Sequence, residues 1–204
     1  MSDKKQSVMI GPWRLHHSEN VYENPWLRLE HHEVTTPGNT PGIYGKVCFK
    51  NRAVGVIPVD EQGYTWLVGQ YRYPLQAYSW EIPEGGCPLD SSAPEAALRE
   101  LAEETGLRAA ALHPLMTLHT SNSCTDEVAQ IYVARGLTLG ESAPEPCEEL
   151  EIRRLPLTEV IDMALSGEIT DAISVAALLK LHALLLKYEG CWRTLLGRLP
   201  PSEI

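Results

Sequence analysis

The sequence predicts an α/β sandwich built on a mixed sheet, and three observations support this prediction. Runs rich in β-forming residues precede, separate and follow helical patterns along the 204 residues. Short turn sequences join several of these runs, as they do between neighbouring antiparallel strands. The composition, 44% apolar and 22% charged, is typical of a globular protein with one core, or one core and a small appendage.

The first fifty residues predict a β-hairpin-like unit with little core of its own. A short irregular lead is followed by two extended segments, around Trp26–Val34 and Ile43–Lys50. The stretch between them, TTPGNTPG, has the proline and glycine content of a turn. We therefore expect residues 1–50 to form an N-terminal β unit and residues 51–204 to form the main domain.

The main domain opens with β-rich runs. RAVGVIPV and YTWLVGQY are joined by DEQG, a tight-turn sequence that predicts a hairpin or meander, and SWEIPEGG ends a further extended piece. Three more strands and two helices follow. The strands are expected at Leu112–His119, at Val128–Ala134 and in LEIRRLPL, and the helices at about Leu157–Leu165 and Asp171–Lys187.

The strongest helix signal lies in SSAPEAALRELAEETG. Ser92 followed by Glu95 has the spacing of a capping box, and Pro94 is in the first turn. Gly106 stands where a helix commonly ends in the left-handed conformation. These signals predict one helix from about residue 93 to residue 105.

Three glutamates crowd the end of this helix: Glu100, Glu103 and Glu104. Their spacing places like charges on one side of the helix, which costs stability. One interpretation is a solvated surface face, partly neutralised by Arg99 four residues before Glu103. The other is a cation site, because Mg²⁺ binds clustered carboxylates together with carbonyl and water oxygens. The preceding glycine-rich loop, PEGGCPLD, can present such carbonyls.

The stretch GGCPLDSSAPEAALRELAEETGL resembles the Nudix box. The matching positions are Gly85, Arg99, Glu100, Leu101, Glu103, Glu104, Gly106 and Leu107. Ser91 stands where the pattern has its first glutamate, and Asp90 and Glu84 are the two candidates to replace that carboxylate. The flanking segments WEIPEGG, NRAVGVIPV, GQYRYPL and DAISVAALL are similar to the ADP-ribose and nucleotide-sugar pyrophosphatase branch of the family. The resemblance implies a Nudix-type α/β/α sandwich with a mixed sheet.

The resemblance also implies an activity and a metal site. Family members use Mg²⁺ or Mn²⁺ to hydrolyse a nucleoside diphosphate linked to another group, so the expected substrates are ADP-ribose and nucleoside diphosphate sugars. The expected products are a nucleoside monophosphate and a sugar phosphate. By position, Glu100 and Glu104 are the principal metal ligands, Glu103 is a further ligand or a bridge through water, and Glu84 contributes its backbone carbonyl. Arg99 orients the glutamates.

The general base of this branch often comes from an acidic loop away from the box. GESAPEPCEEL occupies the corresponding place, which makes Glu148 the first candidate, with Glu145 and Glu149 as alternatives. A solvated acidic loop is the competing interpretation.

Substrate contacts are implied at several other positions. Arg72 in QYRYP matches an arginine of the branch and is expected to face a phosphate or the terminal ribose. An exposed arginine at a strand end is the alternative. The remaining candidates are Trp26, Tyr22 and Arg28 for the nucleobase, with Glu81 and Glu127 near the substrate.

Two further functions stay open at this point. One is a Nudix-like module that senses a nucleotide sugar without cleaving it, which the serine at position 91 favours. The other is hydrolysis of a dinucleoside polyphosphate or of coenzyme A. In the ADP-ribose branch the N-terminal unit exchanges between subunits, so the resemblance also implies a homodimer.

Charge and hydropathy exclude other classes of protein. The net charge of −10 and the absence of a Lys/Arg cluster argue against nucleic acid as a partner. No apolar run approaches the roughly 20 residues that span a bilayer, and the first residues contain no signal-peptide core. The five cysteines include no C-x-x-C pair, so we expect free thiols and a cytoplasmic location.

Overall fold

The computed structural model describes residues 7–140, 149–191, 194–195 and 199. The chain forms two compact units. The first contains Met1–Asn51 with His119–Glu127, and the second contains Arg52–Leu118 with Val128–Ile204. The sequence assigns dimerisation and substrate contacts to residues 1–50 and hydrolysis to residues 51–204, and this assignment of roles stays a prediction.

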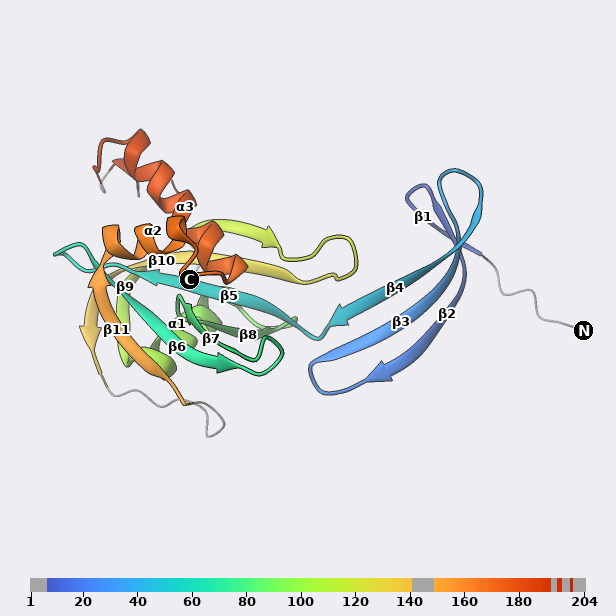
Figure 1. The fold of residues 1–204 in the computed structure, drawn as a ribbon, viewed down its shortest axis with the longest axis horizontal. Helices are drawn as coiled ribbons and strands as arrows, with labels where there is room; N and C mark the ends of the chain where they lie inside the picture. Colours follow the sequence, from blue (N-terminus) through green and yellow to red (C-terminus); the bar gives the residue numbers. More distant parts are fainter. Residues whose placement is uncertain (1–6, 141–148, 192–193, 196–198, 200–204) are drawn as a thin grey trace, which may run out of the picture. The chain divides into compact units, whose positions relative to one another are not determined.

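The first unit is a four-stranded antiparallel sheet (Figure 1). Its strands, in spatial order, are β1 (Val8–Ile10), β2 (Trp13–Glu23), β3 (Leu27–Thr35) and β4 (Pro41–Phe49). The predicted irregular lead is therefore wrong, since β1 and β2 occupy it. Most of β2 is exposed on both faces, so this strand lacks the alternation of apolar and polar residues that identifies a half-buried strand.

Residues 119–127 belong to this first unit through contacts with β4. Asp126 accepts a hydrogen bond from the Phe49 N–H at 2.8 Å and forms an ion pair with Lys46 at 2.9 Å. The Tyr44 hydroxyl donates to the Ser123 carbonyl. These contacts attach a segment far away in the sequence to the N-terminal sheet.

The second unit contains two sheets, with strand orders β8-β5-β10-β9 and β11-β6-β7. β5 and β10 run parallel, whereas β6 pairs antiparallel with both β7 and β11, so the expected mixture of strand directions is present. The strands are β5 (Asn51–Pro58), β6 (Tyr64–Arg72), β7 (Ala77–Glu81), β8 (Glu84–Pro88), β9 (Leu107–His119), β10 (Val128–Leu139) and β11 (Glu151–Pro156).

The predicted hairpin between β5 and β6 is wrong, because the two strands belong to different sheets. The connection does turn tightly. Asp60 Oδ1 accepts hydrogen bonds from the N–H groups of Gln62 and Tyr64, both at 2.9 Å. Asp60 Oδ2 accepts from Arg154 of β11, which draws the turn toward the second sheet. A local turn sequence identifies the change of direction but not the strand that pairs next.

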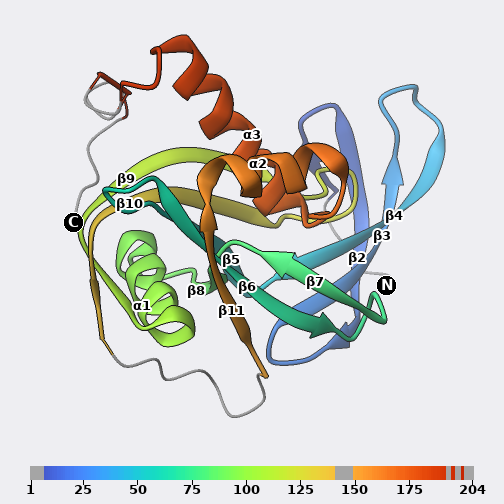
Figure 2. The ribbon, with the colours of Figure 1, turned by 60° about the vertical axis from the view of Figure 1, so that its left-hand side comes forward.

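The helices cover the sheets from opposite sides (Figures 1 and 2). α1 (Ala93–Thr105) lies on one side, and α2 (Leu157–Ser166) and α3 (Ala172–Lys187) lie on the other. The alternation along β5 explains this arrangement: Val54 and Val56 pack in the α1 core, whereas Ile57 packs in the α2–α3 core. The α/β/α sandwich expected from the sequence is confirmed.

The helix ends agree with the predictions to within one residue, whereas β9 begins at Leu107, five residues earlier than expected. It follows the left-handed Gly106 directly, so α1 and β9 share one sharp turn. In the part of the chain that the structure describes, no helix has the length and hydropathy needed to cross a bilayer.

Candidate active site

The segment predicted as the site consists of the glycine-rich stretch and α1. The prediction of a loop is wrong for Glu84–Pro88, because these residues form strand β8. Ser92 caps the helix by accepting a hydrogen bond from the Glu95 N–H at 3.5 Å, and Gly106 ends it. In β8, Gly85 lies directly against the Glu100 carboxylate. A Cβ atom on Gly85 would stand 2.5 Å from Glu100 Oε2, so only glycine leaves room for this carboxylate.

The three glutamates of α1 have different surroundings. Glu104 is only 3% exposed, and its Oε2 accepts a hydrogen bond from the backbone N–H of Glu84 at 3.0 Å. The Glu100 side chain is mostly buried, whereas the Glu103 side chain is one-third exposed. A solvated surface face therefore does not describe this helix. The main chain of Glu84 lies beside Glu104, as a shared metal site requires.

Arg99 joins the loop to the helix. Its guanidinium donates to the Gly86 carbonyl at 2.9 Å, to Glu100 Oε1 at 2.7 Å and to Glu103 Oε2 at 2.6 Å. Burial opposes the charge of Arg99, but the carboxylates of Glu100 and Glu103 raise its pKa overall. The pairing with Glu103 predicted from the spacing is present. Arg99 thus contacts both glutamates and, through the Gly86 carbonyl, holds β8 beside them.

These residues fit a hard divalent cation. The acidic groups that lie against β8 are the carboxylates of Glu100 and Glu104, and carboxylate oxygens are donors that Mg²⁺ and Mn²⁺ prefer. The contact of Glu100 with Gly85 and the burial of Glu104 hold two of the carboxylates in place. Such preorganisation favours a cation because less ordering is needed on binding.

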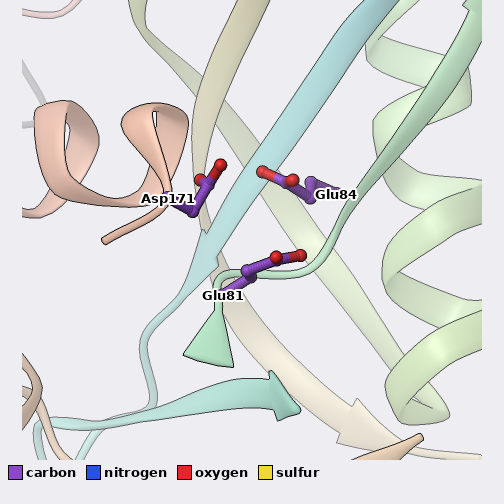
Figure 3. A group of neighbouring side chains, drawn as sticks. All are labelled: Glu81, Glu84 and Asp171. Atoms are coloured by element: carbon purple, nitrogen blue, oxygen red, sulfur yellow. The ribbon is translucent and has the colours of Figure 1, made fainter. Parts of the chain in front are cut away.

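A second acidic group, which we call the acidic triad, consists of Glu81, Glu84 and Asp171 (Figure 3). One carboxylate oxygen from each residue lies within 4.8 Å of the others. Arg72 pairs with this triad: its Nε donates to both oxygens of Glu81 at 2.9 and 3.1 Å, and its Nη2 donates to Glu84 Oε1 at 3.2 Å. Arg72 and Glu81, both candidates from the sequence, therefore lie together.

The triad concentrates negative charge in a largely buried place. Burial, and then the charges of Asp171 and Glu81, raise the pKa of Glu84 well above its ordinary value. Hydrogen bonds to Glu81 raise the pKa of Arg72, so its guanidinium stays charged. Glu84 Oε2 is buried and has no hydrogen-bond partner among the described residues.

Asp171 was missed as a site residue, because the sequence indicated it only as the start of a helix. It caps α3: its Oδ2 accepts from the Ser174 N–H at 2.7 Å, and the buried Ser174 hydroxyl accepts from the Ile82 N–H at 2.9 Å. Aspartate is a preferred residue at the N-cap of a helix, because its side chain accepts a hydrogen bond from a backbone N–H of the first turn. Its proximity to Glu81 and Glu84 depends on packing of α3 against the β7–β8 loop.

The candidates for nucleobase contacts lie in the first unit. Trp26 and Tyr22 are exposed in and beside the β2–β3 turn, where Asn24 accepts from the Trp26 N–H at 2.9 Å and its amide donates to the Tyr22 hydroxyl at 3.5 Å. Arg28 is on β3 and pairs with Glu30 at 2.7 Å. Tyr22 and Trp26 are therefore not core residues of this unit.

The remaining candidates are placed as follows. Glu127, in the segment 119–127, accepts a hydrogen bond from the Thr120 hydroxyl. Glu149 is exposed two residues before β11. Glu145 and Glu148 lie outside the described residues.

Ser91, at the position where the family pattern has a glutamate, is exposed. Its backbone carbonyl accepts a hydrogen bond from Arg52 Nη2 at 3.1 Å, and the Leu89 carbonyl accepts from the same nitrogen at 2.6 Å. Arg52 therefore fastens the loop before α1 through main-chain oxygens, without a carboxylate at position 91.

A carboxylate-rich helix packed against a glycine-containing strand offers the oxygen donors that suit divalent cations in phosphate chemistry. The chain belongs to the Nudix family, because the NUDIX domain matches residues 49–178. A nucleoside diphosphate sugar hydrolase N-terminal domain matches residues 13–47. The recognition made from the Nudix box is confirmed.

The chain is also similar to curated relatives over most of its length. It is 31% identical over 170 residues to an ADP-ribose pyrophosphatase of Mycobacterium tuberculosis, covering 81% of each chain. It is 32% identical over 162 residues to an ADP-ribose pyrophosphatase of Bacillus subtilis, covering 78% of this chain and 87% of the relative. A methanol dehydrogenase activator of Bacillus methanolicus is 30% identical, with the same coverage.

A solved structure supports the fold. The crystal structure of an ADP compounds hydrolase matches with a TM-score of 0.78, covering 93% of this chain and 100% of that chain. The sequence identity is 21%, so this likeness concerns the fold alone.

Proposed function

We propose that this protein is a Nudix pyrophosphohydrolase that cleaves the pyrophosphate bond of ADP-ribose or of nucleoside diphosphate sugars. The products are a nucleoside monophosphate and a sugar phosphate. One observation carries the proposal: the Glu100 and Glu104 carboxylates both lie against the start of β8. Glu100 lies against Gly85, and Glu104 accepts a hydrogen bond from the Glu84 N–H. The relatives named ADP-ribose pyrophosphatase and the N-terminal domain of nucleoside diphosphate sugar hydrolases support this substrate class.

In this proposal Glu100, Glu103 and Glu104 hold Mg²⁺ or Mn²⁺ together with the backbone carbonyl of Glu84. The ion supplies neutralisation of phosphate charge and activation of water. Arg99 keeps Glu100 and Glu103 in position through its two ion pairs. In this role Arg99 positions the carboxylate oxygens that would bind the metal.

Glu148 is the proposed general base, with Glu145 and Glu149 as alternatives. Its carboxylate would take the proton from the attacking water. Glu148→Gln is expected to lower turnover by orders of magnitude while Mn²⁺ binding stays unchanged. Turnover close to wild type would remove Glu148 from the mechanism, and Glu145→Gln and Glu149→Gln would then be compared in the same assay.

Substrate binding is assigned to Arg72 and to residues of the first unit. Arg72 is a fixed, charged donor, since Glu81 holds it with paired hydrogen bonds, and guanidinium groups bind phosphate oxygens well. Tyr22, Trp26 and Arg28 are proposed to contact the nucleobase, and Glu81 and Glu127 to lie near the substrate. The exposed ring of Trp26 is available for stacking on a base.

One panel of assays tests the proposed function. Purified full-length protein with Mg²⁺ or Mn²⁺ is incubated with ADP-ribose, with several nucleoside diphosphate sugars, with a dinucleoside polyphosphate and with coenzyme A. We expect release of nucleoside monophosphate from the first two groups, and Glu104→Gln is expected to abolish it. Equal product release by Glu104→Gln would refute the site, and tight binding without cleavage would identify a sensing module instead.

The active form is proposed to be a homodimer located in the cytoplasm. Apolar side chains exposed on the first unit support self-association. These are Val8, Met9, Ile10, Val21, Tyr22, Trp26 and Ile43, each more than half exposed. The cytoplasmic location expected from the sequence stays a prediction.

A further inference from the structure

The acidic triad brings together three carboxylates from three separate elements. Glu81 ends β7, Glu84 begins β8, and Asp171 precedes α3. In Figure 3 the Asp171 and Glu84 carboxylates face each other and Glu81 lies beside them, with one oxygen of each residue within 4.8 Å of the others. The site shares Glu84 with the α1 group, but there it is the Glu84 backbone that contacts Glu104. The Glu84 side chain is directed toward Asp171.

The formal charge of the triad is not balanced by the protein. With all three carboxylates ionised, as they would be around a cation, the single guanidinium of Arg72 leaves a charge of −2, since Arg72 is the cation that pairs with these groups among the described residues. The Glu81 and Glu84 side chains are only 3% and 11% exposed. Like charges at this depth repel strongly, because little water screens them.

One oxygen in the triad has no partner at all within the described structure. Glu84 Oε2 is buried and accepts no hydrogen bond, whereas Glu84 Oε1 and both oxygens of Glu81 are held by Arg72. Asp171 uses Oδ2 to cap α3. A buried acceptor without a partner costs free energy, so its presence indicates a missing ligand.

We propose that the acidic triad binds a divalent cation of its own, separate from the metal site on α1. A charge of +2 would balance the triad, and Glu84 Oε2 would be one of its ligands. Carboxylate oxygens gathered in this way are ligands for hard divalent cations such as Ca²⁺ and Mn²⁺. The ion joins the β7–β8 loop to the start of α3.

The proposal does not depend on the hydrolase activity, so its test uses the metal alone. The α1 site is first disabled in the full-length chain by Glu100→Gln with Glu104→Gln. Mn²⁺ binding is then counted by electron paramagnetic resonance, and Ca²⁺ binding is measured by calorimetry, both without nucleotide. We expect one ion per chain to remain. Adding Glu84→Gln is expected to weaken its affinity at least tenfold, whereas Glu159→Gln, an exposed acid on α2, leaves it unchanged.

Thermal unfolding provides a second readout that separates ligand loss from misfolding. Ca²⁺ is expected to raise the Tm of the α1-disabled protein, but not after Asp171→Asn is added. Asparagine caps a helix as well as aspartate does, so α3 should still form in this variant. Without metal, Glu84→Gln should have a Tm at least equal to its parent, because repulsion is relieved. Absence of the remaining ion, or undiminished binding in both triad variants, would overturn the proposal.

Discussion

At the scale of single residues, Gly85 decides whether Glu100 can occupy its place. A methyl group there would stand 2.5 Å from Glu100 Oε2, so Gly85→Ala must displace the carboxylate. A shift of this size at a reacting centre costs about 10- to 100-fold in rate, and we expect that loss in kcat/KM for ADP-ribose. Gly45→Ala is the matched control, because nothing lies within 4 Å of its added Cβ. An alanine variant at 85 with wild-type rates would contradict the geometry.

Asp60 is a second residue with a testable role, here in folding stability. It is far from α1 in sequence, and it acts through its charge. Burial raises the pKa of Asp60, but hydrogen bonds from the Tyr64 and Gln62 N–H groups and from Arg154 lower it overall, below its ordinary 3.8. The Asp60 carboxylate therefore binds a proton more tightly in the unfolded chain than in the folded protein. The stabilisation that ionised Asp60 gives the folded state is complete above the pKa of Asp60 in the unfolded chain, and it is lost as pH falls through the pKa of Asp60 in the folded protein.

Asp60→Asn is accordingly expected to reduce the free energy of unfolding by about 1–3 kcal/mol at pH 7. The difference from wild type should shrink as the pH is lowered below 3.8. Urea unfolding at pH 7 and at pH 3 measures both values. Glu61→Gln serves as the control, because Glu61 is 73% exposed and its pair with Arg135 should contribute less than about 1 kcal/mol. An equal loss at both pH values would falsify the electrostatic explanation.

At the scale of elements, the start of α3 is fastened to the β7–β8 connection by Ser174. Its hydroxyl is fully buried and accepts the hydrogen bond of the Ile82 N–H. Ser174→Ala leaves that N–H without a partner, so we expect a loss of about 1–3 kcal/mol in the free energy of unfolding. Ser166→Ala removes an exposed hydroxyl from α2 and should cost less than about 0.5 kcal/mol. Equal denaturation midpoints for the two variants would argue against this role for Ser174.

The elements differ in how well the sequence predicts them. α1 was predicted to the residue, because its cap, its first-turn proline and its terminal glycine are local signals. The β5–β6 hairpin was predicted wrongly, because strand pairing depends on residues distant in sequence, here β10 beside β5 and β11 beside β6. β2 was overlooked since its exposed residues produce no alternating pattern.

At the scale of the whole molecule, the proposed homodimer can be tested through the first unit. Ile43 is 71% exposed on β4, and burial of such side chains is the main driving force of association. Light scattering at micromolar concentration is expected to report a dimer for the wild type and a larger share of monomer for Ile43→Asp. Leu186→Asp, which changes an equally exposed residue of α3, should stay dimeric. A monomeric wild type would exclude the dimer.

The sequence by itself determined the family, the sandwich and the metal-binding candidates on α1. These features depend on spacing within one short stretch: residues three and four apart share a helix face, and the glycine-containing β8 lies a few residues before the helix. The pairing of Arg99 with Glu103 follows from the same rule. Such contacts are local, so the order of residues alone specifies them.

Only the tertiary structure decided which distant carboxylates meet. Glu81 and Asp171 are separated by ninety positions, and they approach because α3 packs against the β7–β8 loop through Ser174 and Ile82. The burial of Glu104, which separates it from the solvated Glu103, likewise depends on the whole core. The physical reason is that burial and long-range proximity are products of packing, and no local pattern encodes the partner that a side chain will find.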